Sequence, residues 1–208
     1  MNAHTKPVAI ELPRLDLRIM RVRLIGDSPL ICHAWSEKAK LMMLNKQMKK
    51  AAQKKDAKSP EQDFCDSLYW LTEKPAAGSF QMPDDAKFGF PVIAFKAAAT
   101  SACRFVEGIK MTEVRGAFHI QGEMAQIDGV PAPREDMVRV GMGTADIRYR
   151  GEFKEWSTDL TIRYNAAALA PEQIVNLLNV AGFGVGVGEW RPEKDGSFGM
   201  FHVATDGE

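Results

Sequence analysis

The chain has 208 residues, 45% of them hydrophobic, with 27 Lys and Arg against 27 Asp and Glu. This length supports one well-buried core, and we expect a single domain over residues 1–208 with an insertion at about 34–90. The balanced charge excludes a protein drawn to nucleic acid by its overall field, so any basic surface must be a local patch.

Three cysteines, Cys32, Cys65 and Cys103, are widely spaced and odd in number. They offer neither a disulfide framework nor a C-x-x-C metal pair, which favours a reducing compartment. Residues 1–14 lack an apolar signal core, and no run approaches the roughly 18 apolar residues of a membrane span. We therefore expect a cytoplasmic protein with no membrane contact, no metal and no other cofactor.

The first periodic element is 17–25, LRIMRVRLI, in which apolar residues fall on both alternation phases. This pattern predicts a buried strand with a bulge. A helix is predicted from Ser36, a plausible N-cap, and its apolar positions at helical spacing are Leu41, Leu44 and Met48.

Eight lysines lie between Lys38 and Lys58, against one acidic residue, Asp56. Such a run indicates either a solvated helix face or a binding surface, and no aromatic residue interleaves it. Ser59 and Pro60 close the segment. A second short helix is predicted to end before Pro75, with apolar positions Phe64, Leu68 and Leu71.

After a loop at 75–91, a third helix is predicted over Val92–Glu107. Five apolar side chains are expected to pack inward: Phe95, Ala98, Ala102, Phe105 and Val106. Lys96, Thr100 and Arg104 recur at i, i+4 and i+8 and share one stripe. Two cations with a hydroxyl between them can follow a phosphate backbone, although ordinary helix-surface residues give the same pattern.

The C-terminal half alternates strands with one helix. Strands are predicted at 117–121 and 137–140 with a loop between them, and a hairpin from 147–153 and 156–164. A helix begins at Pro171 and ends before Gly182, and a last strand lies near 200–203. The order predicts an α+β fold of the ferredoxin-like type, with an antiparallel sheet, helices on one face and a helical insertion after the first strand.

The most informative segment is 182–201, GFGVGVGEWRPEKDGSFGMF, which sets six glycines beside Trp190, Arg191 and Lys194. Glycine lets a backbone approach a ligand closely, Trp offers a stacking plane and Arg a phosphate fork. The G-x-G-x-G-x-G spacing after a helix excludes a dinucleotide fingerprint, and Asp195 after Lys194 excludes a P-loop. A polyanion groove is the favoured interpretation, and a twisted strand and hairpin is the alternative.

Three blocks of the sequence resemble the repeat-associated RNA-binding (RAMP) proteins of CRISPR effector complexes. RVRLIGDSPLICH at 21–33 is similar to their first strand and turn, PVIAFKAAATSA at 91–102 to a helix start, and 182–201 to their C-terminal glycine-rich loop. The Cas7-type backbone subunits are the most similar branch. The resemblance implies an RRM-like core that lines single-stranded RNA and polymerises along it, with Lys96 near the guide backbone.

The resulting hypothesis is a non-catalytic protein that binds single-stranded nucleic acid, with RNA favoured over DNA, and assembles along it. Its other partners would be effector-complex subunits. The protein would be encoded by a phage. The hypothesis assigns phosphate contacts to Lys96, Thr100, Arg104, Arg191 and Lys194. It assigns base stacking to Trp190. In the assembly, the lysine run at 38–58 would meet a neighbour's Asp84 and Asp85. A phage structural or assembly protein that binds no nucleic acid is the competing hypothesis.

His33 is the one candidate for a catalytic residue. In this superfamily, metal-independent RNA cleavage uses a histidine after the first strand, and His33 stands in about that place, where it can act as a general base. No partner lysine or tyrosine is evident, and Asp27 precedes the turn, so a loop-aspartate role is not transferred. The sequence therefore predicts no enzyme, with a metal-independent RNA endonuclease as the alternative.

Overall fold

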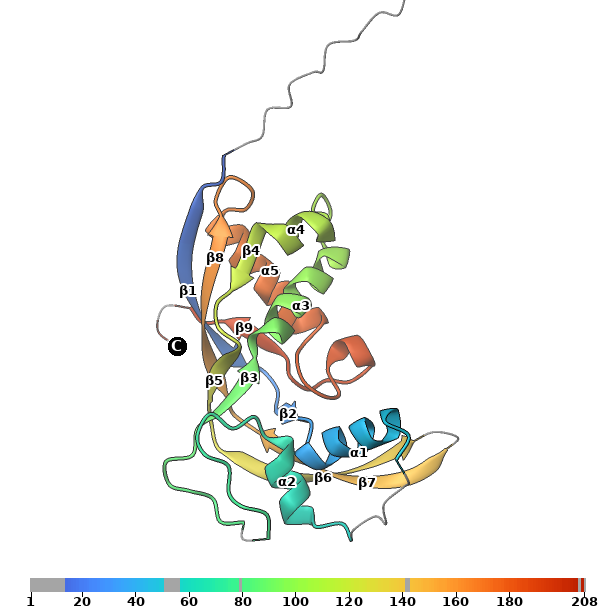
Figure 1. Ribbon diagram of the computed structural model, residues 1–208. Coiled ribbons are helices and arrows are strands. Elements are labelled where there is room, and N and C mark those ends of the chain that lie inside the picture. The colour runs from blue at the N-terminus through green and yellow to red at the C-terminus, as the bar shows by residue number, and fades with distance from the viewer. Residues whose placement is uncertain (1–13, 51–56, 79, 141–142, 206, 208) are drawn as a thin grey trace, which may run out of the picture.

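The computed structural model describes residues 14–50, 57–78, 80–140, 143–205 and 207, which form two antiparallel sheets and five α-helices (Figure 1). The predicted α+β class is confirmed. The larger sheet contains β1 (Leu17–Gly26), β3 (Phe88–Pro91), β4 (Phe118–Ile120), β5 (Met124–Asp128), β8 (Ser157–Asn165) and β9 (Phe201–Val203). The smaller sheet contains β2 (Leu30–Cys32), β6 (Pro131–Val140) and β7 (Thr144–Phe153). The helices are α1 (Glu37–Gln47), α2 (Pro60–Ser67), α3 (Val92–Ala102), α4 (Met111–Ala117) and α5 (Pro171–Gly184).

The larger sheet has the ferredoxin-like topology. Along the chain, its core elements are β1, α3, β4 with β5, β8, α5 and β9. In the sheet, the strands neighbour one another as β9-β1-β8, and β8 also pairs with both β4 and β5. This is the split βαβ arrangement, with its second strand broken into two pieces. Helices α3, α4 and α5 cover one face, as predicted (Figure 1).

Strand β1 is half buried and regular. Val22 and Leu24 pack under the helices, whereas Leu17 and Ile19 are exposed. The register with β8 is continuous from Leu17 opposite Asn165 to Ile25 opposite Ser157. The predicted bulge is therefore wrong, because the second apolar phase lies on the open face of the sheet and needs no kink to bury it.

Aromatic side chains fill the space between the sheet and α3. The fully buried Phe95 lies with its ring centroid 5.8 Å from that of Phe201 and 6.0 Å from that of Phe90, both edge to face. Such pairs add about 0.5–1.5 kcal/mol beyond area burial. Helix α5 reaches Gly184, three residues further than predicted. Gly182 lies inside it, where a Cβ would be 1.7 Å from the Phe201 carbonyl oxygen, so this glycine permits helix–strand contact and does not end the helix.

Strands β7 and β8 do not form the predicted hairpin. β7 pairs with β6 and β2 in the smaller sheet, whereas β8 pairs with β1 in the larger one. The loop predicted before residue 137 is also wrong, since β5 and the first half of β6 occupy it. Pro131 and Pro133 are accommodated in β6 because it is an edge strand, where a missing N–H is tolerated.

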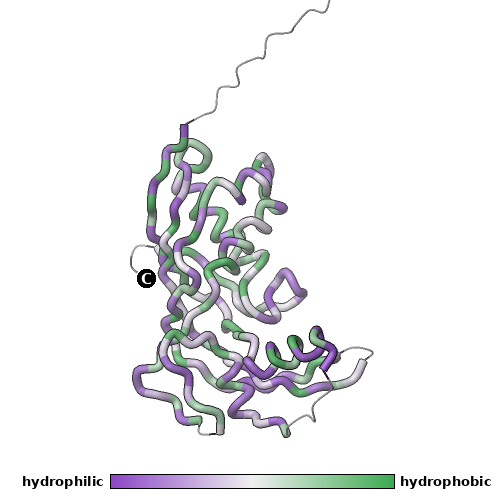
Figure 2. Tube along the Cα trace, viewed as in Figure 1, coloured by the Kyte–Doolittle hydropathy of each residue, from purple (hydrophilic) through white to green (hydrophobic). Residues whose placement is uncertain are grey.

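Residues 34–87 carry α1 and α2, beside the smaller sheet (Figure 1). Ser36 caps α1 as predicted, because its Oγ accepts from the Ala39 N–H at 3.1 Å. No residue of α1 is buried, so the predicted inward face of Leu41, Leu44 and Met48 is wrong. Figure 2 shows hydrophobic and hydrophilic residues mixed along this helix. Residues 51–56 of the lysine run lie outside the described residues.

Helices α2 and α3 are shorter than predicted. Ser59 and Pro60 begin α2, and that helix ends at Ser67, so Leu71 lies beyond it. Helix α3 ends at Ala102 and continues as a 3₁₀ turn, η1 (Cys103–Phe105). Its predicted inward residues Phe95, Ala98 and Ala102 are buried.

Candidate nucleic-acid groove

A groove of about 340 Å³ lies between α3 and the glycine-rich segment. The α3 side presents small residues, Ala94, Ala97, Ala98 and Ser101, and the opposite side presents residues 185–189 with Arg191 and Glu193. Ile31, His33 and Tyr69 line it where the larger sheet gives way to the smaller one. Small side chains on one wall and loop backbone on the other leave space for an extended ligand.

The glycine-rich segment doubles back on itself. The Val187 N–H donates to the Gly199 carbonyl at 2.9 Å, and Gly199 has a φ of +65°. A Cβ at Gly199 would be 1.7 Å from the Val187 carbonyl oxygen, so only glycine allows the two stretches to lie this close. Residues 185–200 contain the 3₁₀ turn η2 (Pro192–Lys194) and no strand, so the strands of the hairpin alternative are not formed, although glycines such as Gly199 do relieve crowding within the protein.

Three predicted phosphate ligands meet at the rim of this groove. Arg104 Nη2 donates to Glu193 Oε1 at 3.1 Å, and Arg191 Nη2 donates to Glu193 Oε2 at 2.9 Å. The exposed Lys194 follows directly. Burial would raise the pKa of Glu193, but the hydrogen bond from Arg191 and the nearby cations hold it below its usual value. Three cations thus gather around Glu193, while Glu189 lines the same groove and the exposed Asp195 follows Lys194.

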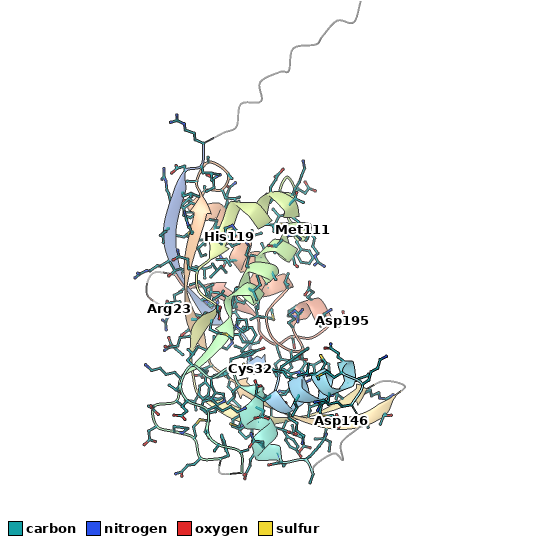
Figure 3. The ribbon with its side chains drawn as sticks, viewed as in Figure 1. Arg23, Cys32, Met111, His119, Asp146 and Asp195 are labelled. Atoms are coloured by element: carbon teal, nitrogen blue, oxygen red, sulfur yellow. The ribbon has the colours of Figure 1, made fainter. Side chains whose placement is uncertain are left out.

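Lys96 and Thr100 lie apart from that rim. Thr100 is buried, and its Oγ1 donates to the Lys96 carbonyl at 2.9 Å. Lys96 is two residues from Ala94 and thus on the far side of α3 from the groove. Its Nζ lies 2.9 Å from His119 Nδ1, and burial together with the charge of Arg115 lowers the pKa of Lys96. Figure 3 shows His119 on β4, away from Asp195 in the glycine-rich segment.

Trp190 joins the loop to an ion-pair network below it. The residue is 38% exposed, and the Arg150 guanidinium carbon lies 5.9 Å from the ring centroid. Trp190 also has a φ of +55°, which is unusual for a residue with a side chain. The indole can therefore stack with only part of its surface.

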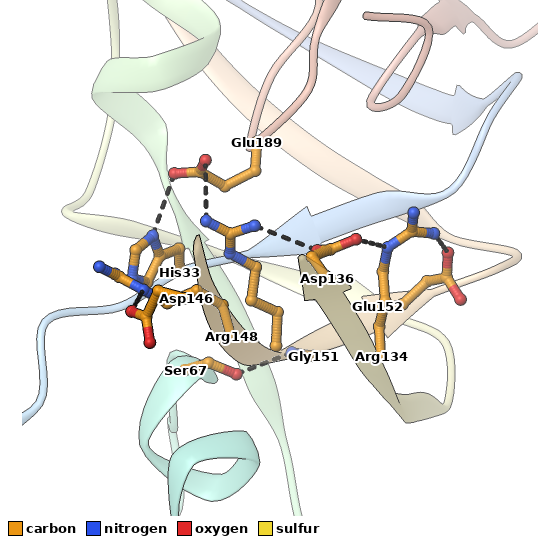
Figure 4. Close-up of polar contacts among 10 residues, drawn as sticks. His33, Ser67, Arg134, Asp136, Asp146, Arg148, Gly151, Glu152 and Glu189 are labelled. Carbon is orange, nitrogen blue, oxygen red and sulfur yellow. Dashed lines mark hydrogen bonds and ion pairs between the residues drawn. The ribbon is translucent and has the colours of Figure 1, made fainter. Parts of the chain in front are cut away.

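The buried network connects the loop to the smaller sheet (Figure 4). Glu189 Oε1 lies 3.1 Å from His33 Nδ1, and its Oε2 lies 3.5 Å from Arg150 Nη2. Arg150 in turn donates to Asp136 Oδ2 at 3.1 Å. The pKa of Glu189 is lowered, first by the hydrogen bond with His33 and then by the charge of Arg150. Arg150 is buried, and its Nε is without a hydrogen-bond partner in the described structure.

Arg134 extends the same network. It donates to Asp136 Oδ1 and to Glu152 Oε1, both at 2.8 Å. Its guanidinium also lies 4.6 Å from the ring centroid of Phe198, at the returning end of the glycine-rich segment. The network thus holds both ends of the loop against β6 and β7.

The open face of the larger sheet carries no aromatic ring on its two longest strands, and its Arg23 forms ion pairs with Asp128 and Asp159. Arg21 and Arg23 of β1 lie on it beside Thr161 and Arg163 of β8. RRM domains stack bases on aromatic residues of this face. The RRM-like base platform implied by the resemblance is therefore absent from β1 and β8, and the groove lies on the helical side.

Sequence reasoning missed two exposed aromatics beside the rim. Phe105, predicted to be in the core, is 58% exposed, and Phe183 is 76% exposed. For Phe183 a signal existed, because it lies about 200° around the helix from the buried Ala181. For Phe105 none did, because the switch from α3 to η1 rotates it away from the inward stripe.

The described residues contain no group of three His, Cys, Asp or Glu side chains that could hold a metal ion. None of the described helices has both the length and the apolarity to span a bilayer. No protein-family model matches the chain, and neither does the sequence of any curated protein. Among solved structures it is similar to Cmr6 from Pyrococcus furiosus, with 9% identity, coverage of 92% of this chain and 100% of that chain, and a TM-score of 0.46. A likeness at that TM-score carries no argument about function.

Proposed function

We propose that the chain is a non-catalytic protein that binds single-stranded nucleic acid along the groove between α3 and the glycine-rich segment. The observation that carries the proposal is the convergence of Arg104, Arg191 and Lys194 around Glu193 at one rim of the groove. Guanidinium and ammonium groups bind phosphates without regard to base sequence. A near-neutral protein can do this because the positive charge is local.

The backbone of the loop supports the same assignment. Gly186 and Gly188 line the groove beside the small side chains of α3, so a ligand can approach main chain on one side and alanines on the other. A narrow groove of this kind suits a single strand better than a duplex. Following the resemblance, we propose RNA as the preferred ligand over DNA.

The test is the affinity of the protein for a fluorescent single strand of about 12 nucleotides, followed by anisotropy over a range of salt concentrations. With three cations contacting phosphates, log K should fall with log salt at a slope of about −2, at ~0.7 per contact. Arg191→Ala with Lys194→Ala should weaken all sequences alike and flatten the slope by about 1.4.

A matched control is Arg18→Ala with Lys154→Ala, which removes the same two kinds of charge. Arg18 pairs with Asp16 at the start of β1, and the exposed Lys154 lies in the turn between β7 and β8. The control should bind like the wild-type protein. Salt-independent binding, or equal losses in the two double variants, would contradict the groove.

We also propose that subunits assemble along the strand. A groove of about 340 Å³ holds only a short stretch of nucleic acid, so contacts between neighbouring subunits would extend the occupied length. Light scattering with strands of increasing length should show the mass rise by one subunit per fixed number of nucleotides. One subunit at every length would reject assembly and leave binding intact.

A second candidate function, metal-independent RNA cleavage, has one observation in its favour. His33 lies in the groove with Glu189 orienting its ring, and Tyr69 lines the same groove. A general base oriented by a carboxylate is a common catalytic arrangement. We expect no specific cleavage of single-stranded RNA in the presence of a chelator, and scission that His33→Ala abolishes would establish the enzyme instead.

A further inference from the structure

Two phenylalanines stand in solvent at the end of α3 and α5. Phe183 is 76% exposed and Phe105 is 58% exposed. Seven other phenylalanines of the chain are at most 5% exposed: Phe64, Phe88, Phe90, Phe95, Phe118, Phe153 and Phe201. Single exposed apolar side chains are common on proteins, whereas contiguous apolar patches mark interaction sites, so the relative position of the two rings matters.

Phe105 and Phe183 are neighbours in the fold. Phe105 ends η1, and its ring lies against Gly184, the residue after Phe183. A Cβ at Gly184 would be 3.1 Å from Phe105 Cε2, so the glycine lets the ring lie against the last turn of α5. The sequence places both aromatics 78 positions apart, and the packing of α3 on α5 brings them together.

This aromatic surface is continuous with the basic rim. The Arg104 guanidinium carbon lies 5.9 Å from the Phe105 ring centroid, within the range of a cation–π contact. The same guanidinium pairs with Glu193, which it shares with Arg191. Aromatic rings beside phosphate-binding cations are the arrangement by which proteins hold single strands, since each base offers a face to stack on.

We propose that Phe105 and Phe183 stack unpaired bases of the strand whose phosphates contact Arg104, Arg191 and Lys194. The inference rests on the proposed function and narrows its ligand to strands with unpaired bases. Arg104 beside the Phe105 ring favours this occupant over an uncharged apolar protein surface. Phe105 and Phe183 thus take the stacking role that the sequence had assigned to the half-covered Trp190.

The test compares an ordinary single strand with an abasic strand of the same length and a duplex of the same sequence. The wild-type protein should bind the ordinary strand at least tenfold more tightly than either competitor. Phe105→Ala with Phe183→Ala should lower affinity for the ordinary strand about tenfold and leave affinity for the abasic strand unchanged. Both side chains are mainly exposed, and circular dichroism should show the variant folded.

The control is Met137→Ala, which removes an exposed apolar side chain of β6 and should change nothing. Equal binding of the ordinary and abasic strands by the wild-type protein would overturn the stacking while leaving phosphate binding in place. No binding of any strand would overturn both proposals. A double variant that binds strands normally but loses self-association in light scattering would reassign the surface to a second copy of the chain.

Discussion

The molecule contains two clusters of charged side chains that differ in how completely they are paired. In the buried network, Arg150 and Arg134 share the carboxylates Asp136, Glu152 and Glu189, and the Arg150 side chain is 6% exposed. At the groove rim, the side chain of Arg104 is 49% exposed, and Glu193 is the carboxylate that faces it. The same residue types are thus enclosed by the protein in one place and accessible to a ligand in the other.

The difference assigns a structural role to the buried network and a binding role to the rim in the proposed function. A buried charge has to be paired inside the protein, because the interior cannot solvate it, so a buried network fixes geometry and has little left to offer a ligand. An exposed, underpaired cluster contributes little to folding but attracts polyanions. We therefore expect changes in the network to alter stability and changes at the rim to alter affinity.

The largest effect should come from Arg150→Met. This variant removes the cation that Asp136 and Glu189 share, but Asp136 keeps Arg134 and Glu189 keeps His33, so the loss should be about 1.5–3 kcal/mol, as for hydrogen bonds to charged groups. Urea unfolding should show that loss in the free energy of unfolding. Arg18→Met, at a side chain 62% exposed, should cost less than ~1 kcal/mol. Equal, small losses in the two variants would erase the distinction between the clusters.

A smaller effect is expected from Glu193→Gln. The change frees Arg104 and Arg191 from the carboxylate they share, so affinity for a single strand should rise by about fivefold at low salt, the equivalent of ~1 kcal/mol of charge interaction. Anisotropy at two salt concentrations measures it. Glu113→Gln, which removes an exposed carboxylate from α4, should leave affinity unchanged. Weaker binding in Glu193→Gln would mean that the carboxylate positions the arginines.

Lowering the pH should destabilise the buried network by a smaller amount. The folded-state pKa of Glu189 lies below its ordinary value of 4.5, first because of the hydrogen bond with His33. A lowered pKa adds stability above the unfolded-state value, and that stability is lost as pH falls through the folded-state value. The urea concentration at the midpoint of unfolding should therefore decrease as the pH drops below about 4.5. The decrease should be less steep in Glu189→Gln. Parallel curves for the two proteins would remove Glu189 from the linkage.

The smallest effect should come from Lys96→Ala. Lys96 lies across α3 from the groove, next to His119, so its removal should change single-strand affinity less than twofold. Anisotropy under the conditions used for Arg191→Ala with Lys194→Ala provides the comparison. A loss equal to that of the rim variant would show that the strand crosses the far side of α3 as well.

Much of the fold could be predicted because its signals are local. The alternation in β1, the cap at Ser36 and Pro171 at the start of α5 each act within a few residues. The separation of β7 from β8 could not be predicted, because alternation shows which residues face a core and not which strand lies alongside. The exposed α1 was missed for a similar reason, since helical spacing does not supply a surface to pack against.

Only part of the candidate site could be predicted, again because the sequence pattern carries local information. Arg104, Arg191 and Lys194 do converge, although nothing in the local sequence of α3 indicates that its end meets the glycine-rich segment. Lys96 shares a helical stripe with Arg104, but the 3₁₀ turn after Ala102 carries Arg104 towards the loop and leaves Lys96 behind. A periodic pattern describes a helix only as far as that helix continues.

The doubled-back loop also bears on the kinetics of binding. Besides its internal hydrogen bonds, the Glu189 N–H donates to the Ile31 carbonyl at 3.1 Å, and the Gly199 N–H donates to the Pro29 carbonyl at 2.8 Å. The loop is thus tied to the start of β2 from both of its arms before any ligand arrives. Because the entropy of ordering this segment is lost when the chain folds, a strand that binds as proposed would meet a preorganised wall. Association can then proceed at the rate set by charge-steered encounter, with no closing step to wait for.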